Sequence, residues 1–174
     1  MESLDWKQAI EEHGPRVWAT VYRVLGHSAD AEDCFQEAFL AAFRVGQRQP
    51  VRDLRALLVR AATARAIDRL RQKARHPTLA LNGDGQEPAA PGCLDPAEWM
   101  ERSERMDVLR TALARVAPQQ AEAFCMKYLS DMTQKEIGHE LGVSESAAGV
   151  LIHRAKLRLR ELLEHPATAQ KGGS

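Results

Sequence analysis

The sequence predicts an all-α protein made of two small helical domains joined by a flexible linker, the second ending in a helix-turn-helix. Leu, Ala, Arg and Glu dominate, and aromatic residues make up only 5% of the chain. No alternating run rich in Val, Ile and Thr reaches the length of a strand. Apolar residues instead recur at steps of three and four, which is the period of helices that bury one face.

A break in this helical period sets the expected domain boundaries. A chain of 174 residues has room for one compact domain or for two of about 70 residues each. The stretch 77–96 is rich in Pro and Gly and has no helical period, which is typical of a linker. We therefore expect a first domain over residues 1–76, a second over 97–165, and a frayed tail over 166–174.

Three helical segments are predicted before the linker. The first covers residues 4–25, with a break or bend expected at Gly14-Pro15. The second begins at Ser28 or Asp30 and carries carboxylates in its first turn, where the helix dipole favours them. Its outer face is acidic and polar, and solvation alone accounts for such a face. The residues of that face are Glu32, Asp33, Gln36 and Glu37.

The third segment is strongly basic. Between Arg44 and Arg75 there are ten Lys or Arg residues and only two Asp, although the chain as a whole has 24 basic and 24 acidic residues. One apolar stripe of this segment continues as Arg65 and Arg69. A neutral protein that gathers cations on one helix is expected to meet a polyanion there, although arginines also solvate ordinary helix faces.

The stretch 131–156 predicts two short helices around a tight turn. Thr133 is an N-cap, and Glu136 three residues later completes a capping box. Gly142 ends the first helix and Ser144 caps the second. This is the pattern of a helix-turn-helix whose second helix lies in the major groove of DNA, although an ordinary helical hairpin fits it too. The predicted outer face presents Ser146, Val150, His153 and Arg154, with Lys156, Arg158 and Arg160 further along.

No motif for catalysis or for metal or cofactor binding is found. There is no Gly-rich phosphate loop and no nucleophile elbow, and His139-Glu140 lacks the second His of a zinc motif. We therefore expect no catalytic residue, no metal and no cofactor. Cys34, Cys93 and Cys125 have no CxxC spacing, so we expect no disulfide, and we expect the two in helical segments, Cys34 and Cys125, to be buried thiols. No apolar run has the length of a membrane span, so we expect a soluble, cytoplasmic protein without membrane insertion.

Two segments, taken together, resemble a known family. The first resembles region two, the promoter-melting domain of bacterial sigma factors, and reads ADAEDCFQEAFLAAFR followed by LRALLVRAATARAIDRLRQKAR. The second resembles region four and reads MTQKEIGHELGVSESAAGVLIHRAKLRLRELL. Their order, with a linker and no region three between them, is similar to the extracytoplasmic function (ECF) group. The resemblance covers about Trp6 to Leu163.

The resemblance implies an alternative sigma factor that binds core RNA polymerase and promoter DNA, with an anti-sigma factor as a further partner. It implies that core polymerase is bound by Asp33, Gln36, Glu37 and Phe39. It implies contacts with the −10 element by Arg60, Arg65, Arg69, Arg71 and Lys73. It implies contacts with the −35 element by Ser144, Ser146, Val150, His153, Arg154 and Lys156. The alternative is a free-standing helix-turn-helix regulator that binds DNA without polymerase. A third hypothesis, an enzyme, is disfavoured because the motifs of catalysis are missing.

The chain departs from the family pattern in both regions. Leu57 stands where Trp is usual, and Thr63-Ala64 stands where an Arg-Asn pair is usual, so an amide suited to base edges is lost. In the second helix of the helix-turn-helix, Gly149 and Leu151 stand where Lys and Arg are common. Two missing cations are expected to lower the salt slope of DNA binding by about two units and to weaken binding to all sequences.

Overall fold

The computed structural model describes residues 5–76 and 96–166, which form seven helices and no strand, so the all-α prediction is confirmed. The predicted linker and tail lie outside the described residues, apart from Pro96 and Pro166 at their edges. The helices are α1 (Trp6–Leu25), α2 (Ser28–Arg48), α3 (Leu54–Arg75), α4 (Pro96–Leu113), α5 (Pro118–Tyr128), α6 (Gln134–Leu141) and α7 (Glu145–Glu164).

Helix α1 is more regular than the sequence suggests. It begins after Asp5, whose carboxylate accepts hydrogen bonds from the backbone N–H of Lys7 and Gln8 at 3.0 and 3.2 Å. The expected break at Gly14-Pro15 is wrong, because the helix continues through both residues. The fixed φ of proline is compatible with a helix, and packing against neighbouring helices offsets the lost backbone donor.

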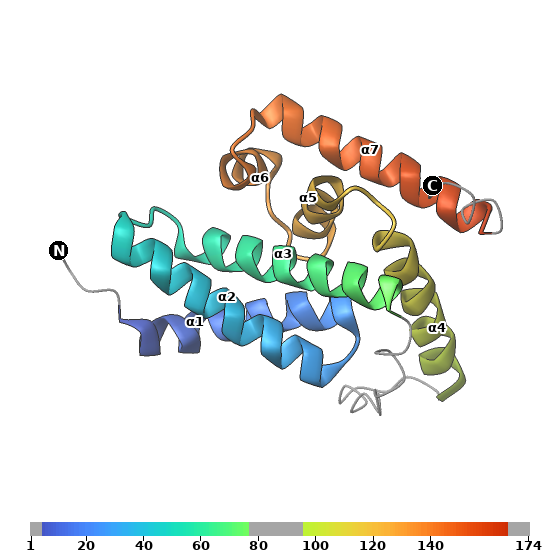
Figure 1. The fold of residues 1–174 in the computed structure, drawn as a ribbon, viewed down its shortest axis with the longest axis horizontal. Helices are drawn as coiled ribbons and strands as arrows, with labels where there is room; N and C mark the ends of the chain where they lie inside the picture. The colour runs from blue at the N-terminus through green and yellow to red at the C-terminus, as the bar shows by residue number, and fades with distance from the viewer. Residues whose placement is uncertain (1–4, 77–95, 167–174) are drawn as a thin grey trace.

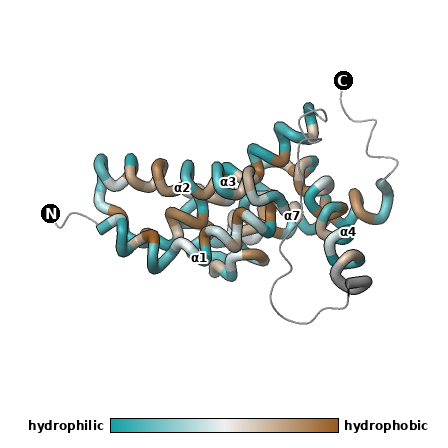
Figure 2. The backbone as a smooth tube through the Cα atoms, turned by 90° about the horizontal axis from the view of Figure 1, so that it is seen from below, coloured by the Kyte–Doolittle hydropathy of each residue, from teal (hydrophilic) through white to brown (hydrophobic). Residues whose placement is uncertain are grey.

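Helix α3 is the central element of the fold. Figure 1 shows it crossing the middle of the molecule, with α1 and α2 on one side and α5, α6 and α7 on the other. Along α1 and α2 the chain alternates between hydrophobic and hydrophilic residues, as amphipathic helices do (Figure 2). Buried positions on α3 recur all along its length: Ala56, Leu58, Val59, Ala62, Thr63, Ala66, Ile67 and Leu70.

One apolar core extends through both halves of the chain. Ile67 on α3 belongs to the same buried cluster as Val21 on α1, Leu113 on α4 and Leu159 on α7. A second cluster joins α3 to the helix-turn-helix and contains Ala56, Val59, Ala123, Met126, Met132, Ile137, Ala148 and Ile152. Burial of apolar surface therefore holds the two predicted domains against each other.

Polar contacts also cross between the two halves. The hydroxyl oxygens of Thr20 and Ser130 lie 2.9 Å apart, and both side chains are buried. Arg55 Nη2 donates to a carboxylate oxygen of Glu136 at 2.5 Å. Arg23 Nη1 donates to a backbone carbonyl at the end of α5, at 2.9 Å. We refer to this packing of the two halves as the closed arrangement.

Candidate polymerase and nucleic-acid interfaces

The acidic face of α2 divides between surface and core. Asp33, Gln36 and Glu37 are exposed, as the resemblance requires of polymerase contacts. Phe39 instead lies in the core with only 8% of its surface exposed, whereas its neighbour Leu40 is 55% exposed. Leu40 lies at helical spacing from Gln36 and Glu37, so the exposed stripe that begins with the polar residues ends in an apolar side chain. Pattern analysis missed it because the adjacent apolar positions look alike in the sequence.

Three of the predicted DNA-contacting cations face this acidic helix. Arg65, Arg69 and Lys73 follow one another at steps of four on α3. Arg65 Nε lies 3.6 Å from a carboxylate oxygen of Glu37, and Arg69 Nη2 donates to Asp33 at 3.1 Å. Two residues predicted to bind polymerase are thus paired with two residues predicted to bind DNA.

The first turn of α2 closes the contact with α3. The carboxylate of Asp30 lies 3.3 Å from Arg69 Nε and also contacts the ammonium group of Lys73. One turn later, Cys34 is buried with a free thiol, as predicted. Burial raises the pKa of the Cys34 thiol to about 11, and the positive charge of Arg69 opposes this rise.

The remaining two of the five predicted DNA-contacting cations face the second half of the chain. Arg71 Nη1 donates to the backbone carbonyls of Ala114 and Val116 at 3.3 and 2.9 Å. Arg60 is exposed and acts electrostatically on Glu122 of α5. Burial raises the pKa of Glu122, and Arg60 counteracts that shift. The structure therefore separates the five predicted cations into two groups on different sides of α3.

The helix-turn-helix forms with the predicted caps. Thr133 Oγ1 accepts from the backbone N–H of Glu136 at 3.2 Å, and the Glu136 carboxylate accepts the Thr133 N–H at 2.6 Å. The Thr133 hydroxyl also donates to this carboxylate, at 2.8 Å, and the two bonds that Thr133 donates to it are the main reason that the pKa of Glu136 is lowered. Gly142 has φ of 67°, which glycine adopts without strain. Ser144 Oγ accepts the Ala147 N–H at 3.0 Å and so caps α7.

The outer face of α7 is open to solvent. The residues predicted to contact the −35 element are all exposed, although the Ser144 oxygen is also engaged in the cap. Lys156 Nζ lies 5.7 Å from the ring centroid of Tyr128 on α5, a cation–π distance. The exposed residues are Ser144, Ser146, Val150, His153, Arg154 and Lys156.

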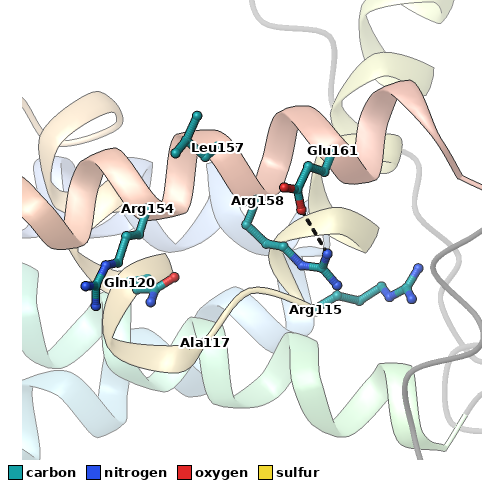
Figure 3. Close-up of a pocket in the computed structure, with 7 residues that line it drawn as sticks. All are labelled: Arg115, Ala117, Gln120, Arg154, Leu157, Arg158 and Glu161. Atoms are coloured by element: carbon teal, nitrogen blue, oxygen red, sulfur yellow. Dashed lines mark hydrogen bonds and ion pairs between the residues drawn. The ribbon is translucent and has the colours of Figure 1, made fainter.

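A cationic groove extends this face along α7 (Figure 3). It has a volume of about 390 Å³ and lies between α7 and the turn from α4 to α5. Arg154 and Arg158 extend from α7 toward this turn, which carries Arg115, and toward the first turn of α5, which carries Gln120. Arg158 Nη1 is 3.1 Å from the carboxylate of Glu161. Arg115 and Gln120 were not predicted as site residues, because no local signal brings them next to α7.

Comparisons with known proteins agree with this arrangement. Residues 9–76 match Sigma-70 region 2, and residues 106–159 match Sigma-70, region 4. The chain is 32% identical over 161 residues to the RNA polymerase sigma factor CarQ of Myxococcus xanthus, covering 91% of this chain and 88% of CarQ. It is 30% identical over 157 residues to the ferric citrate uptake sigma factor FecI of Escherichia coli, covering 88% and 87%.

Two further matches extend the comparison. The ECF RNA polymerase sigma factor SigE of Mycolicibacterium smegmatis is 30% identical over 160 residues; the match covers 91% of this chain and 61% of SigE. Among solved structures, the sigma factor RpoE of Bartonella quintana, in complex with the anti-sigma factor NepR, matches with a TM-score of 0.58 at 20% identity. That match covers 93% of this chain and 98% of RpoE, and it supports the shared fold.

Two helical modules in this order, the second with an exposed helix-turn-helix, define a DNA-binding transcription initiation factor. The chain belongs to the ECF group of bacterial RNA polymerase sigma factors. It is an alternative sigma factor, which binds core RNA polymerase and promoter DNA and directs promoter recognition. Within residues 5–76 and 96–166, no helix is long and apolar enough to cross a membrane.

Proposed function

We propose that core RNA polymerase docks on the exposed stripe of α2 formed by Asp33, Gln36, Glu37 and Leu40. The observation that carries this proposal is their shared exposure at helical spacing on one face. Leu40 supplies apolar area that a partner can bury, and the carboxylates supply charge that orients the partner. Phe39 supports this surface from the core beneath it.

Charge reversal on α2 tests this docking surface. Glu37→Arg should weaken co-purification with core polymerase about tenfold or more, because it places a cation in a surface selected for negative charge. Glu11→Arg, on the exposed surface of α1, is the matched control and should co-purify like the unchanged protein. Equal recovery of the two variants would contradict the proposed surface.

The basic side of α3 is proposed to hold the opened −10 strand. Single-strand capture requires cations that follow a phosphate backbone, and Arg65, Arg69 and Lys73 form such a row. Arg60 is already exposed on the other side of α3, whereas Arg71 becomes available to DNA only when the second half of the chain moves away, because Arg71 is bonded to the turn between α4 and α5.

The exposed face of α7 is proposed to read the −35 element. Ser146, Val150 and His153 are placed to meet base edges, as in other helix-turn-helix proteins. The cationic groove beside them would bind the phosphate backbone through Arg115 and Arg158, which extends the contact beyond the reading helix.

The closed arrangement must open for both DNA elements to be bound at once. Helix α5 packs against both α3 and α7, so the axes of α3 and α7 lie within about 20 Å of each other. The −10 and −35 elements are about 25 base pairs apart, which is about 85 Å of B-DNA. A fully extended segment of 19 residues, the length of 77–95, can span about 65 Å, which is far more than the separation of α3 and α7 in the closed arrangement. We propose that docking on polymerase separates the halves.

The closed arrangement also suggests how a protein partner would regulate the chain. RpoE of Bartonella quintana forms a complex with the anti-sigma factor NepR. A partner of that class that binds the closed arrangement would keep Arg71 covered and the two DNA-binding faces too close for a promoter. We further propose that the protein acts in the cytoplasm and uses binding energy, without covalent chemistry of its own.

A further inference from the structure

The side chain of Gln134 crosses from α6 onto the reading helix. Gln134 is the first residue of α6, and its Nε2 donates to the backbone carbonyl of Glu145, in the first turn of α7, at 2.8 Å. A Cβ built on Gly149 would lie 2.5 Å from this Nε2 and 3.0 Å from the Cδ atom. The amide of Gln134 therefore occupies the space that a side chain at position 149 would fill.

This space is part of the predicted DNA-reading face. Ser146, Val150 and His153 are exposed on α7 at helical spacing around Gly149. Within the described residues, the amide of Gln134 makes one hydrogen bond, through a single N–H. Its second N–H and its Oε1 remain available, so the reading face presents one donor and one acceptor side by side.

We infer that Gln134 is a specificity-determining residue that reads an adenine in the −35 element; this rests on the proposed role of α7. Adenine presents N7 as an acceptor and N6 as a donor in the major groove, and a glutamine amide pairs with both. The bond to the Glu145 carbonyl fixes the amide before DNA arrives, which reduces the ordering cost of binding. Position 149 thus lacks the cation that is common in the family, and the neutral amide of Gln134 from α6 takes its place.

The test uses holoenzyme assembled from core polymerase and the full chain. A duplex library randomised across the promoter region is selected for binding, and the bound sequences are read. The unchanged protein should enrich a −35 motif that contains adenine. Gln134→Ala should reduce the preference for adenine at one position by at least about fivefold and leave the −10 preference unchanged. Gln119→Ala, on the exposed surface of α5, is the control and should leave the motif intact.

Gly149→Ala provides a second variant, and a folding defect could not explain its effect. Alanine favours the helix more than glycine does, while its methyl group displaces the Gln134 amide. It should therefore lose the same adenine preference without losing thermal stability. If Gln134→Ala leaves the −35 motif unchanged, or if it changes the preference for a base other than adenine, the inference about Gln134 is overturned but the proposed role of α7 is not. Failure of the unchanged protein to enrich any −35 motif would overturn the proposed role of α7 as well.

Discussion

Arg65 and Arg69 carry two roles that compete in the free protein. Their guanidinium groups are proposed to hold the opened −10 strand, yet they pair with Glu37 and Asp33 at 3.6 and 3.1 Å. Those carboxylates belong to the proposed polymerase-docking surface. A polymerase that binds the carboxylates would release the arginines, so docking and DNA binding are expected to be coupled.

Neutralising the carboxylates should therefore strengthen binding of the free protein to single-stranded DNA. The double variant Asp33→Asn, Glu37→Gln is expected to bind a labelled oligothymidine about two- to fivefold more tightly at low salt, since exposed ion pairs contribute about 0.2–1 kcal/mol each. Fluorescence anisotropy measures the affinity. Glu11→Gln, Glu12→Gln on α1 removes the same charge without breaking these pairs. An equal gain for both double variants would contradict the coupling.

At this scale the sequence predicted residue types better than residue partners. The cations of α3 and the carboxylates of α2 were both identified from their spacing. Their mutual pairing was not, because each pattern was assigned to its own helix. Phe39 and Leu40 differ by only one position, or about 100° around the helix, and only tertiary packing decides which of them is buried.

At the scale of single elements, the helix ends follow closely from local chemistry. The capping box of α6 and the caps at Gly142 and Ser144 were predicted from side chains within three residues of each helix end, and all are confirmed. Such signals are readable because a cap satisfies its own neighbouring backbone groups. The continuous α1 shows where prediction from local signals fails, since packing rather than local preference keeps the chain helical through Pro15.

The capping box makes a direct prediction for stability. Thr133→Ala should lower the free energy of unfolding by about 1 kcal/mol, because one backbone donor at the start of α6 loses its acceptor. For a chain of this size we expect the melting temperature to fall by about 2–4 °C. Thr111→Ala is the control, since that hydroxyl donates to a carbonyl within α4 and caps no helix. Equal melting temperatures for both variants would contradict the role of the cap.

At the scale of the whole molecule, the closed arrangement depends on contacts that no local pattern predicts. Thr20 and Ser130 are 110 positions apart in the chain, and Arg55 and Glu136 are 81 apart. Nothing near either residue indicates its partner. The sequence therefore predicts two modules and a linker but not how the modules pack, since their shared core uses apolar residues that each module could equally bury alone.

The contact between α3 and α5 should be sensitive to pH through Glu122. Burial raises the pKa of this carboxyl above its ordinary value of 4.5 in the folded protein. The folded state then binds its proton more tightly than the unfolded state, so stability falls as pH rises from about 4.5 through the raised pKa. Glu122→Gln removes this loss. It should raise the melting temperature at pH 7.5, and its advantage should vanish near pH 4.5.

The matched control for this pH profile is Glu104→Gln, which neutralises an exposed carboxyl on α4. Its melting temperature should follow that of the unchanged protein across the same pH range. An advantage of Glu122→Gln that is the same at pH 4.5 and pH 7.5 would show that the charge of Glu122 is not its cause.

Abortive transcription tests the central claim most directly. Core polymerase and this protein are combined on a double-stranded promoter template and on the same template with a preformed bubble. We expect RNA from both templates, because the α2 surface docks on polymerase and the α3 cations stabilise the opened strand without the usual Asn. RNA from the bubble template alone would contradict strand opening by α3. No RNA from either template, together with no binding to core polymerase, would contradict the sigma-factor account as a whole.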